Sequence, residues 1–453
     1  MDIVLLGDKG RDDAMADRLQ GHKLHVLGQC KNPGLVRKSS LSGGQFHLID
    51  STKNITLIAD IVQSIRPDIF ITNFDDSLAN GIVDELRKRV ADKRIPDLLI
   101  PCPNKDASRI EWDKFYLREL IDEIDQQYNP TNFMVTTTHD ISKAISFFQK
   151  KHIKVAIKPR NLTGGKGVKV MGKHLNSYKE AKEYASFVLS SDSQTGVEIQ
   201  EKLVGAEFTL QLFTDGKVII RPPETYDYPY REDGDVGPGT GGMGAFSMKR
   251  DVRLPFLVQK DYDTAIDLME RLLIKLKDNG LDYKGVLYPT FFKTPNGLKI
   301  VEINARGGDP ELINILDLLE DDVDLVNALK LIAEGNLTQG SIRYKDQASA
   351  VLYLVSPNYC YSSSQTYDFN LDTEIIEALG VKVRFGATEL VKGKHFRSVG
   401  ASRTVGLSAL GETPWAARKK IHDAIDKGFS KPLALQFRNQ VADKSYIKKL
   451  STQ

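Results

Sequence analysis

The run VEINARGGDPEL, residues 301–312, places several groups capable of chemistry close together. If residues 298–305 form a strand, Glu302 and Asn304 project from one face, because side chains two apart on a strand point the same way. A carboxylate and an amide oxygen at this spacing suit Mg²⁺ that bridges nucleotide phosphates. The alternative is a salt-bridged edge strand that ends in a Gly-Gly turn.

The end of the same run adds a cation and the start of a helix. Arg306 lies one further step along that face, where a guanidinium could stabilise charge on a transferring phosphoryl group. Asp309, Pro310 and Glu311 then turn the chain into a helix whose amino end would favour an anion. We therefore take Arg306 and Asp309 as candidate catalytic residues.

A glycine-rich flap is predicted for IKPRNLTGGKGVKV, residues 157–170. Lys158 would lie on its first strand and offer a fixed positive charge. The loop between the two strands contains Gly164, Gly165, Lys166 and Gly167. Its bare backbone amides could close on phosphate oxygens. A Walker A loop is excluded because Gly-x-x-x-x-Gly-Lys-Ser/Thr is absent. An ordinary hairpin with glycine bulges remains the alternative.

Two further segments are candidates for binding small molecules. VEIQEKLVGAEF, residues 197–208, ends a strand in a hinge whose backbone could read an adenine edge, while a carboxylate could accept ribose hydroxyls. DGDVGPGTGGMGAF, residues 233–246, has six glycines. We expect this second loop to lie with its backbone directly against a substrate, since side chains are largely excluded from it.

Bulk composition excludes several classes of protein. The chain has 453 residues, a formal net charge of +2, and three cysteines, Cys30, Cys102 and Cys360, without metal or disulfide spacing. We expect neither a nucleic-acid nor a membrane partner, because there is no basic footprint and no apolar run of roughly 20 residues. The start MDIVLLGDKG reads as a first strand rather than a signal peptide. The expected location is the cytoplasm, and the expected state is a monomer or dimer.

The predicted elements give an α/β protein. Short apolar runs alternate with helix-like segments over the first hundred residues, which predicts a parallel sheet covered on both faces. A single amphipathic helix is expected over residues 107–128. A strand–loop–strand–helix lid should follow, and then a strand-rich stretch to about residue 303, interrupted by a helix that begins at Asp261.

The order of flap, hinge and carboxylate strand resembles that of the ATP-grasp enzymes, and within them the phosphoribosylamine–glycine ligase family. PNKDASRIEWDKFYLRE is similar to the family's Pro-Ser-x-x-Ala-Ala-x-Leu-Glu-x-Ser-Lys-x-Phe helix, with Glu111 and Lys114 at matching places. VAIKPRNLTGGKGVKV, DGDVGPGTGGMGAFS, VEINARGGDPEL and SRTVGLSALGET resemble four more of its motifs. The resemblance runs over almost the whole chain.

The resemblance implies an ATP-grasp fold with an N-terminal parallel-sheet (pre-ATP-grasp) domain and a C-terminal α+β domain. The implied parts are an N-terminal domain (1–106), a connecting helix (107–130), a lid subdomain (131–195), a catalytic subdomain (196–338) and a C-terminal domain (339–453). It also implies that ATP, an amino acid such as glycine and an amine such as 5-phosphoribosylamine react through an acyl phosphate to form an amide.

Site residues are implied position by position. ATP would be bound by Lys114, Lys158, Gly164, Gly165, Lys166, Gly167, Glu201, Leu203 and Glu207. The other substrates would be bound by Gly7, Gly10, Arg11, Asp227, Asp235, Thr240, Gly241, Gly242, Met243, Gly244 and Arg403. Glu302 and Asn304 would bind Mg²⁺ or Mn²⁺, while Arg306, Lys158 and Asp309 would act in catalysis.

Departures from the family pattern gather near the expected amine and amino-acid sites. Where the family has Gly-x-Gly-Gly-Arg-Glu-His-Ala, this chain has GDKGRDDA, with Lys9 for a glycine and Asp13 for the histidine. Gly307 stands for a phenylalanine, Gln200 for the first glutamate of the hinge pair, and Gly239 for an asparagine. A related enzyme that joins another acid to another amine therefore stays open, as does an ATP-binding sensor or scaffold without ligase activity.

Overall fold

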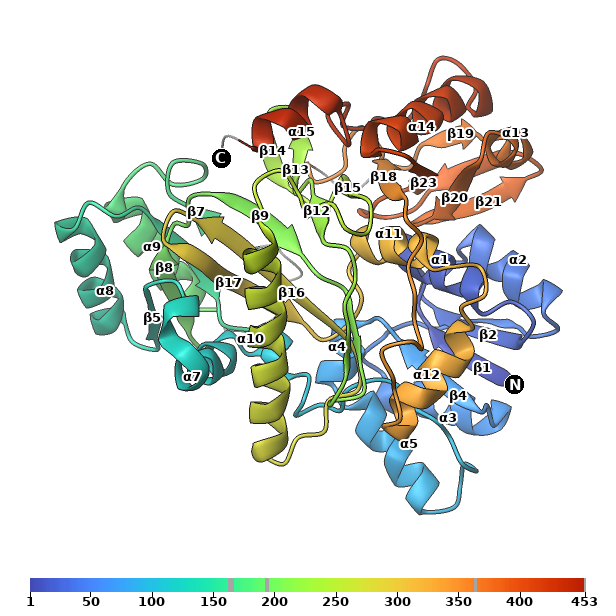
Figure 1. Ribbon diagram of the computed structural model, residues 1–453, viewed down its shortest axis with the longest axis horizontal. Coiled ribbons are helices and arrows are strands. Elements are labelled where there is room, and N and C mark those ends of the chain that lie inside the picture. Colours follow the sequence, from blue (N-terminus) through green and yellow to red (C-terminus); the bar gives the residue numbers. More distant parts are fainter. Residues whose placement is uncertain (162–166, 192–194, 362–364, 452–453) are drawn as a thin grey trace.

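The computed structural model describes residues 1–161, 167–191, 195–361 and 365–451 (Figure 1). Its first sheet is parallel, with strand order β3-β2-β1-β4. The strands are β1 (Asp2–Leu6), β2 (Lys23–Gly28), β3 (Phe46–Leu48) and β4 (Ile69–Thr72). The helices are α1 (Gly10–Arg18), α2 (Pro33–Leu41), α3 (Ile55–Ile65), α4 (Asp75–Ala79) and α5 (Ile82–Ala91). Ile3 and Leu5 join one buried cluster and Val4 and Leu6 another, so both faces of β1 are covered, as predicted.

The single helix expected over residues 107–128 is wrong. The structure has α6 (Arg109–Trp112), α7 (Lys114–Asp125) and a 3-10 turn η1 (Gln126–Tyr128). Asp113 interrupts the helix because its carboxylate accepts hydrogen bonds from the backbone N–H groups of Phe115 and Tyr116 and so caps α7. A side chain that satisfies the first N–H groups of a helix favours a new start at that point.

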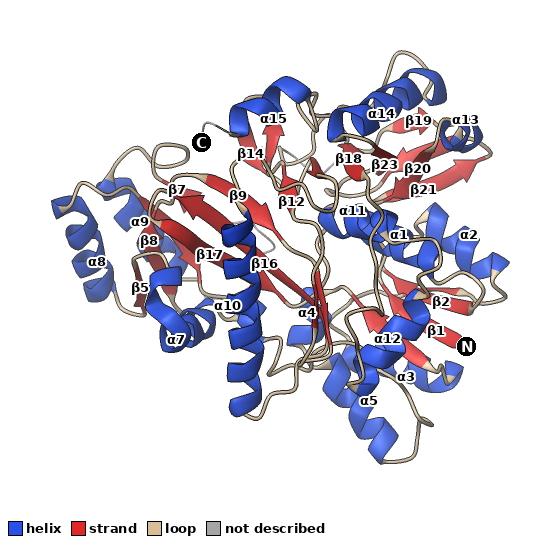
Figure 2. Cartoon of the chain, viewed as in Figure 1, coloured by secondary structure: helices blue, strands red, loops and turns tan. Residues whose placement is uncertain are grey.

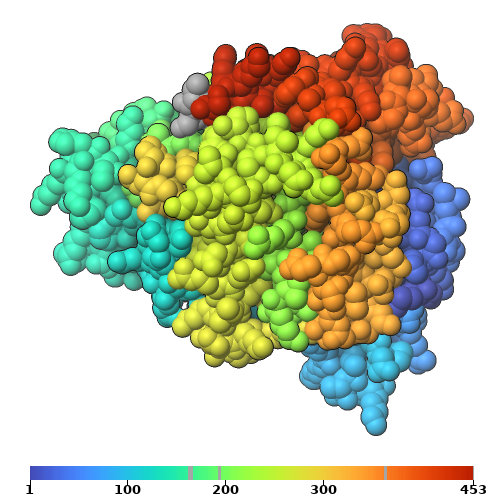
Figure 3. Space-filling view, viewed as in Figure 1, coloured from blue at the N-terminus to red at the C-terminus, as the bar shows by residue number. Residues whose placement is uncertain are grey.

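The lid is an antiparallel sheet of order β5-β8-β6-β7, and it forms a lobe at one side of the molecule (Figure 3). Its elements are β5 (Asn132–Val135), α8 (Thr138–Lys150), β6 (Val155–Pro159), β7 (Lys169–Val170), α9 (Tyr178–Leu189) and β8 (Val197–Glu201). Helix α8 was not among the expected elements. Strand β8 lies between β5 and β6, although it follows residue 195, where the lid was expected to end.

A long sheet forms the centre of the molecule (Figure 2). Its order is β11-β10-β16-β9-β12-β15-β18-β23-β20, and β17 pairs with β16. Those strands are β9 (Ala206–Thr209), β10 (Leu212–Thr214), β11 (Ile219–Ile220), β12 (Thr225–Asp227), β15 (Gly244–Ser247), β16 (Gly285–Thr294), β17 (Gly297–Asn304), β18 (Ala348–Leu354), β20 (Val381–Phe385) and β23 (Val405–Gly411). The C-terminal region therefore shares one sheet with the strands that follow the lid.

Smaller elements complete the structure. A hairpin pairs β13 (Tyr230–Glu232) with β14 (Val236–Gly239), and a sheet of order β19-β22-β21 contains β19 (Asp368–Asn370), β21 (Thr388–Lys392) and β22 (His395–Ser398). The remaining helices are α10 (Gln259–Asp278), α11 (Glu311–Leu318), α12 (Leu325–Glu334), α13 (Thr373–Ala378), α14 (Pro414–Gly428) and α15 (Lys444–Leu450). Among the described residues, no helix is long and apolar enough to cross a bilayer.

Helices α1 and α11 join the N-terminal sheet to the long sheet. Arg18, in the last turn of α1, donates hydrogen bonds to the carbonyls of Leu316 (3.1 Å) and Leu319 at the end of α11. Arg384 of β20 is buried between two carboxylates. It pairs with Asp317 of α11 at 2.6 Å and with Asp17 of α1. These links fix the position of α11, whose other end faces the candidate site.

Replacing Arg384 tests this junction. Arg384→Ala removes the pair with Asp17 and leaves the buried Asp317 with the more exposed Lys382 as its ion-pair partner, so the free energy of unfolding should fall by up to about 3 kcal/mol, the lower end of the cost of breaking a buried pair. The matched control is Arg397→Ala, because Arg397 and its partner Asp368 are both exposed and such pairs contribute little. Urea denaturation followed by circular dichroism compares the two variants with wild type. An Arg384→Ala midpoint as close to wild type as that of the control contradicts the assignment.

Candidate active site

A cavity of about 370 Å³ lies where the lid, the long sheet and the N-terminal region meet. It is lined by charged side chains from most of the elements around it: Arg11, Asp75, Glu111, Lys114, Arg118, Glu207, Asp227, Glu302, Arg306, Asp309, Glu311 and Arg403. Polar and backbone groups from Thr240, Gly241, Tyr288, Thr290 and Asn304 complete the wall, and Val168 of the lid closes one side.

Strand β17 presents its predicted pair of ligands on one face. Asn304 Nδ2 lies 3.4 Å from Glu302 Oε1, which confirms that the two side chains project together. Arg306 continues the row, since its Nη2 donates to Asn304 Oδ1 at 3.2 Å. Strand β17 pairs with the long strand β16, so its side chains are held on a rigid support at the edge of the cavity.

Arg306 is held from behind by carboxylates that the sequence analysis did not assign to the site. Glu111 of α6 lies 3.2 Å from Arg306 Nε and also accepts the backbone N–H of Ala305 at 2.8 Å. Asp75 of α4 approaches Arg306 Nη2 at 4.0 Å. Burial raises the pKa of Glu111 to about 7, against the opposing effect of Arg306. The guanidinium is thereby positioned at the cavity wall.

The lid contributes a buried lysine. Lys158 of β6 is 6% exposed, and burial lowers its pKa, while Glu198 and Glu302 act to raise it. Lys114, at the start of α7, lines the cavity. Among the flap residues, Gly164, Gly165 and Lys166 lie outside the described residues. Gly167 is described, and its carbonyl accepts a hydrogen bond from Tyr184 Oη of α9 at 2.8 Å.

Three further carboxylates of the cavity wall, on β9, β12 and α11, have raised pKa values. Glu207 of β9 has a pKa raised to about 7 by burial and by the nearby charge of Glu302. Asp227 of β12 is desolvated and faces Glu311 and Glu207, so its pKa is raised well above the usual range. Burial also raises the pKa of Glu311, whose Oε1 accepts Tyr288 Oη at 2.6 Å. Such a wall favours a bound cation or a protonated carboxyl group.

Asp309 and Arg403 form a connected pair at the start of α11. Asp309 Oδ2 lies 3.1 Å from Arg403 Nη2, and Asp309 Oδ1 accepts Tyr353 Oη at 2.6 Å. Arg403 also donates to the carbonyls of Gly241 and Gly242. Both charged residues line the cavity, but their strongest bonds are to the protein itself.

The glycine-rich loop divides into two parts. Thr240 and Gly241 line the cavity, in keeping with the expected approach to a substrate. Two other glycines lack side chains for a different reason. A Cβ on Gly242 would meet Asp227 Oδ1 and Pro310 Cδ at 2.6 Å, and one on Gly244 would meet the carbonyl of Val351 at 2.4 Å. Their close neighbours are protein atoms.

The remaining residues of that loop lie away from the cavity lining. Met243 is fully buried in the core. Asp235 sits in the β13–β14 turn, where Oδ1 pairs with Arg438 at 2.6 Å and Oδ2 accepts Tyr446 Oη at 2.8 Å. These contacts attach the hairpin to the C-terminal segment. We find no cavity contact for Met243, Gly244 or Asp235 among the described residues.

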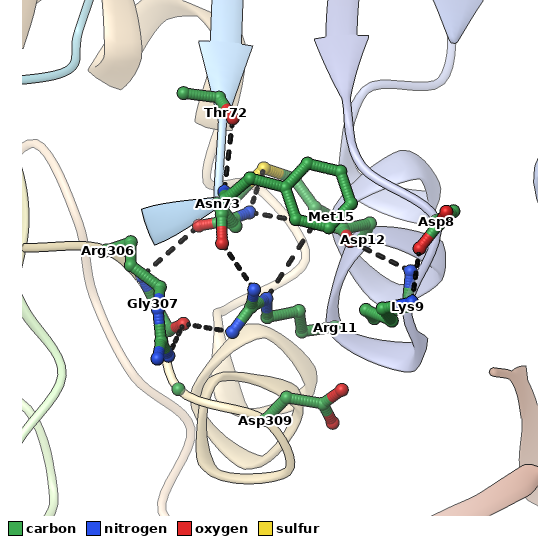
Figure 4. Close-up of polar contacts among 12 residues, drawn as sticks. Asp8, Lys9, Arg11, Asp12, Met15, Thr72, Asn73, Arg306, Gly307 and Asp309 are labelled. Atoms are coloured by element: carbon green, nitrogen blue, oxygen red, sulfur yellow. Dashed lines mark hydrogen bonds and ion pairs between the residues drawn. The ribbon is translucent and has the colours of Figure 1, made fainter. Parts of the chain in front are cut away.

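The N-terminal loop is occupied by protein contacts (Figure 4). Arg11 donates to the carbonyls of Gly307, at 2.9 Å, and Asn73. A Cβ on Gly7 would lie 2.3 Å from the carboxyl carbon of Asp12, and one on Gly10 would lie 2.0 Å from Tyr353 Oη. Of these three predicted substrate-binding residues, only Arg11 lines the cavity.

The departures from the family pattern have structural partners. Asp13 accepts the backbone N–H of Phe385 at 2.9 Å and pairs with Lys38 at 2.6 Å, which ties α1 to β20. A side chain at position 307 would meet Leu312 at 2.3 Å, so the glycine leaves room for the start of α11. Lys9 pairs with Asp8 at 2.7 Å and is not part of the cavity wall.

The hinge residues differ in position. Glu207 lines the cavity, whereas Glu201 and Leu203 do not. Glu201 Oε1 accepts the backbone N–H of Thr131 at 2.7 Å, and Leu203 is partly exposed after the end of β8. Sequence reasoning missed Asp75, Arg118, Tyr288 and Glu311 as wall residues. Of these four, only Glu311 was noticed in the sequence, where it lies at the start of the predicted helix.

The donor set fits a divalent cation that is completed by a ligand. Among the described residues, no three His, Cys, Asp or Glu side chains form a ready-made metal cluster. Glu302 and Asn304 lie at the cavity wall beside carboxylates that lack matching cations, and a cation bound by the Asn304 amide oxygen would replace its hydrogen bond from Arg306. Mg²⁺ is usually held by one or two carboxylates together with substrate phosphates and water.

Comparison with known proteins gives consistent matches. A family model described as the ATP-grasp (A) domain of phosphoribosylglycinamide synthetase matches residues 112–312. A phosphoribosylamine–glycine ligase of Methanobrevibacter smithii is 35% identical over 92% of this chain and 92% of its own length. Another, from Pyrococcus abyssi, is 32% identical over 99% of this chain and 96% of its own length.

Solved structures share the fold. The crystal structure of phosphoribosylamine–glycine ligase from Thermotoga maritima has a TM-score of 0.74 at 22% identity, covering 97% of this chain and 99% of that chain. N5-carboxyaminoimidazole synthetase from Staphylococcus aureus has a TM-score of 0.61 at 14% identity, over 94% and 97% of the two chains. The predicted ATP-grasp fold is confirmed.

The carboxylate wall predicts how stability depends on pH. Because the folded pKa of Glu207 is raised to about 7, its protonated form stabilises the folded state at low pH, and that contribution is lost as pH rises from about 5 to about 8. As pH rises over this range, the thermal unfolding midpoint of Glu207→Gln should therefore fall less than that of wild type. Calorimetry measures it, with Glu374→Gln, an exposed site, as control. Equal pH dependence in all three proteins would refute the assignment.

Proposed function

Because the chain belongs to the phosphoribosylglycinamide synthetase family, we propose that it joins 5-phosphoribosylamine and glycine into glycinamide ribonucleotide, with conversion of ATP to ADP and phosphate. The relatives that carry the name phosphoribosylamine–glycine ligase match over almost their whole length. One structural observation carries the proposal. Glu302 and Asn304 of β17 line one cavity with Lys114 and several carboxylates, and the buried Lys158 of the lid, which is not itself a lining residue, lies near enough to Glu302 for that carboxylate to raise its pKa.

ATP fits this cavity as its metal complex. Lys114 and Lys158 would bind the phosphates, with Gly167 at the described end of the flap. Glu207 would accept ribose hydroxyls, and the backbone near Glu201 and Leu203 would face the adenine. Glu302 and Asn304 would hold Mg²⁺ or Mn²⁺, which neutralises phosphate charge when bound. The position of the two side chains on one face of β17, at the cavity wall, supports this assignment.

The proposed reaction has two steps. A glycine carboxylate oxygen attacks the γ-phosphorus of ATP, and the bond from that phosphorus to ADP breaks. The amine nitrogen of phosphoribosylamine then attacks the acyl carbon, the carbon–oxygen bond to phosphate breaks, and the proton on nitrogen passes to the released phosphate. Arg306 would stabilise charge on the transferring group. The protein's part is positioning and charge neutralisation rather than nucleophilic attack.

The substrate side of the cavity supports binding of an ammonium or amine. Asp227 Oδ1 is buried without a hydrogen-bond partner among the described residues, and Thr240, Gly241 and Gly242 stand beside it. An N–H donor would satisfy this oxygen. Asp227 is therefore our proposed contact for the amino group of glycine or of the incoming amine, with Asp309 and Arg403 shaping the same wall.

One observation favours a second candidate, a related ligase that joins another acid to another amine. Arg11 and Arg403 already donate to backbone carbonyls, and Lys9 pairs with Asp8. A sugar phosphate would favour cations that are free to bind it. In this second candidate, ATP and its metal ion would bind as in the first, but the amine substrate would carry no phosphate group.

Phosphate release measured by a coupled assay distinguishes the two candidates. The purified chain with ATP, Mg²⁺, glycine and freshly made phosphoribosylamine should release one phosphate per amide formed. Omitting either glycine or the amine should abolish release. Tight ATP binding without turnover on this pair, followed by turnover on another acid or amine, would reject the first candidate in favour of the second.

Glu302→Ala tests the metal-ligand role. We expect Mg²⁺-dependent turnover to fall by more than about 100-fold, since even outer-shell partners of a metal contribute 10- to 100-fold. The fold should stay intact because Glu302 is exposed. Glu374→Ala, at an exposed helix position, is the control and should keep wild-type turnover. Retained activity in Glu302→Ala would contradict the role.

A further inference from the structure

Arg118 of α7 joins three parts of the molecule through a complete set of hydrogen bonds. Its guanidinium has five N–H donors. The acceptors are Glu198 Oε1 (2.6 Å), Asn129 Oδ1 (3.1 Å), Ile300 O (3.0 Å), Gln200 Oε1 (3.4 Å) and Val301 O (2.7 Å). Arg118 thus fixes lid strand β8 to strand β17 next to the Glu302–Asn304 row.

Glu198 faces two cations from one side of β8. It is fully buried, and its Oε1 is bonded to Arg118, whereas its Oε2 is buried without a hydrogen-bond partner among the described residues. Lys158 is its direct cross-strand neighbour in the β6–β8 pair. Directly opposed residues of an antiparallel pair share a face, with Cβ atoms roughly 5 Å apart. The second oxygen is therefore available to act on the lysine.

The position of this carboxylate differs from the family pattern. Gln200 stands where the family has the first glutamate of its hinge pair. Glu198 lies two residues earlier, on the same face of the strand, so it is opposite Lys158, whereas Gln200 is opposite Ala156. Glu198 therefore supplies the carboxylate that Arg118 binds and places it beside the lysine.

We propose that Glu198 is a positioning residue that is shared between Arg118 and Lys158 and keeps the buried lysine charged and directed at the nucleotide phosphates. This inference rests on the proposed nucleotide site but not on the identity of the acid or amine. The groups that face Lys158 are Glu198 of β8, Glu302 of β17, and Lys114 and Arg118 of α7. Burial and the two cations oppose the charged lysine, and the carboxylates favour it.

Glu198→Gln is the informative variant. The amide oxygen can still accept from Arg118, but the negative charge beside Lys158 is lost. Loss of a close opposite charge lowers a lysine pKa by about one unit or more. The pH at which affinity for Mg²⁺–ATP falls on the basic side should therefore move down by about one unit, which weakens binding about tenfold above it. Titration calorimetry from about pH 6 to about pH 10 measures this directly.

The double variant Glu198→Gln/Gln200→Glu separates the proposal from a structural role. It returns a carboxylate to Arg118 and restores the net charge, but places that carboxylate opposite Ala156. We expect wild-type thermal stability with the shifted affinity profile. A wild-type profile in either variant would overturn the proposal. If the single variant does not fold, the double variant alone decides. ATP binding by the wild-type chain tests the nucleotide site itself. If the wild type does not bind ATP, the proposed function fails; if it binds ATP but the variants keep the wild-type pH profile, only the role of Glu198 fails.

Discussion

The candidate site depends on one constraint: the carboxylates that line its cavity have too few cations to pair with. Glu207, Asp227 and Glu311 are held on the long sheet and α11, and burial raises the pKa of each. The nearby arginines are already bonded to Glu111, Asp309 or backbone carbonyls. A site of this kind favours a nucleotide that brings its own divalent cation, and it favours an amine over a second anion.

The scaffold keeps these charges from separating. Arg118 fixes the lid to β17, and Arg18 and Arg384 fix α11 to the N-terminal sheet and to β20. Two positions that depart from the family pattern have contacts of their own in this structure, since Asp13 accepts a hydrogen bond from the Phe385 N–H and Gly307 leaves room for Leu312. Asp13 thereby connects α1 to β20, whereas Lys114 and Glu207 of the proposed nucleotide site line the cavity.

Local patterns predicted much of the fold and the row of β17, whereas the family resemblance supplied other residues of the cavity wall, among them Arg11, Asp227 and Arg403. Alternation along β17 was enough to place Glu302 and Asn304 together, because a strand has a fixed period of two. The break at Asp113 was missed because its capping bonds compete with a helix pattern that is otherwise continuous. Arg118 could not be found from sequence, since its partners lie as far away as Val301. The sequence also could not show why positions 242 and 244 are glycines, because the reason is their packing against protein atoms that are distant in the chain.

The most direct measurement is calorimetric titration of the wild-type chain with ATP, once with Mg²⁺ and once with EDTA. Four phosphate charges facing an acid-lined wall should bind poorly unless a cation accompanies them, so affinity should fall by at least about 100-fold in EDTA, equivalent to about 2.7 kcal/mol. Equal affinity in the two titrations would mean that Glu302 and Asn304 hold no metal and that the carboxylate wall has another purpose.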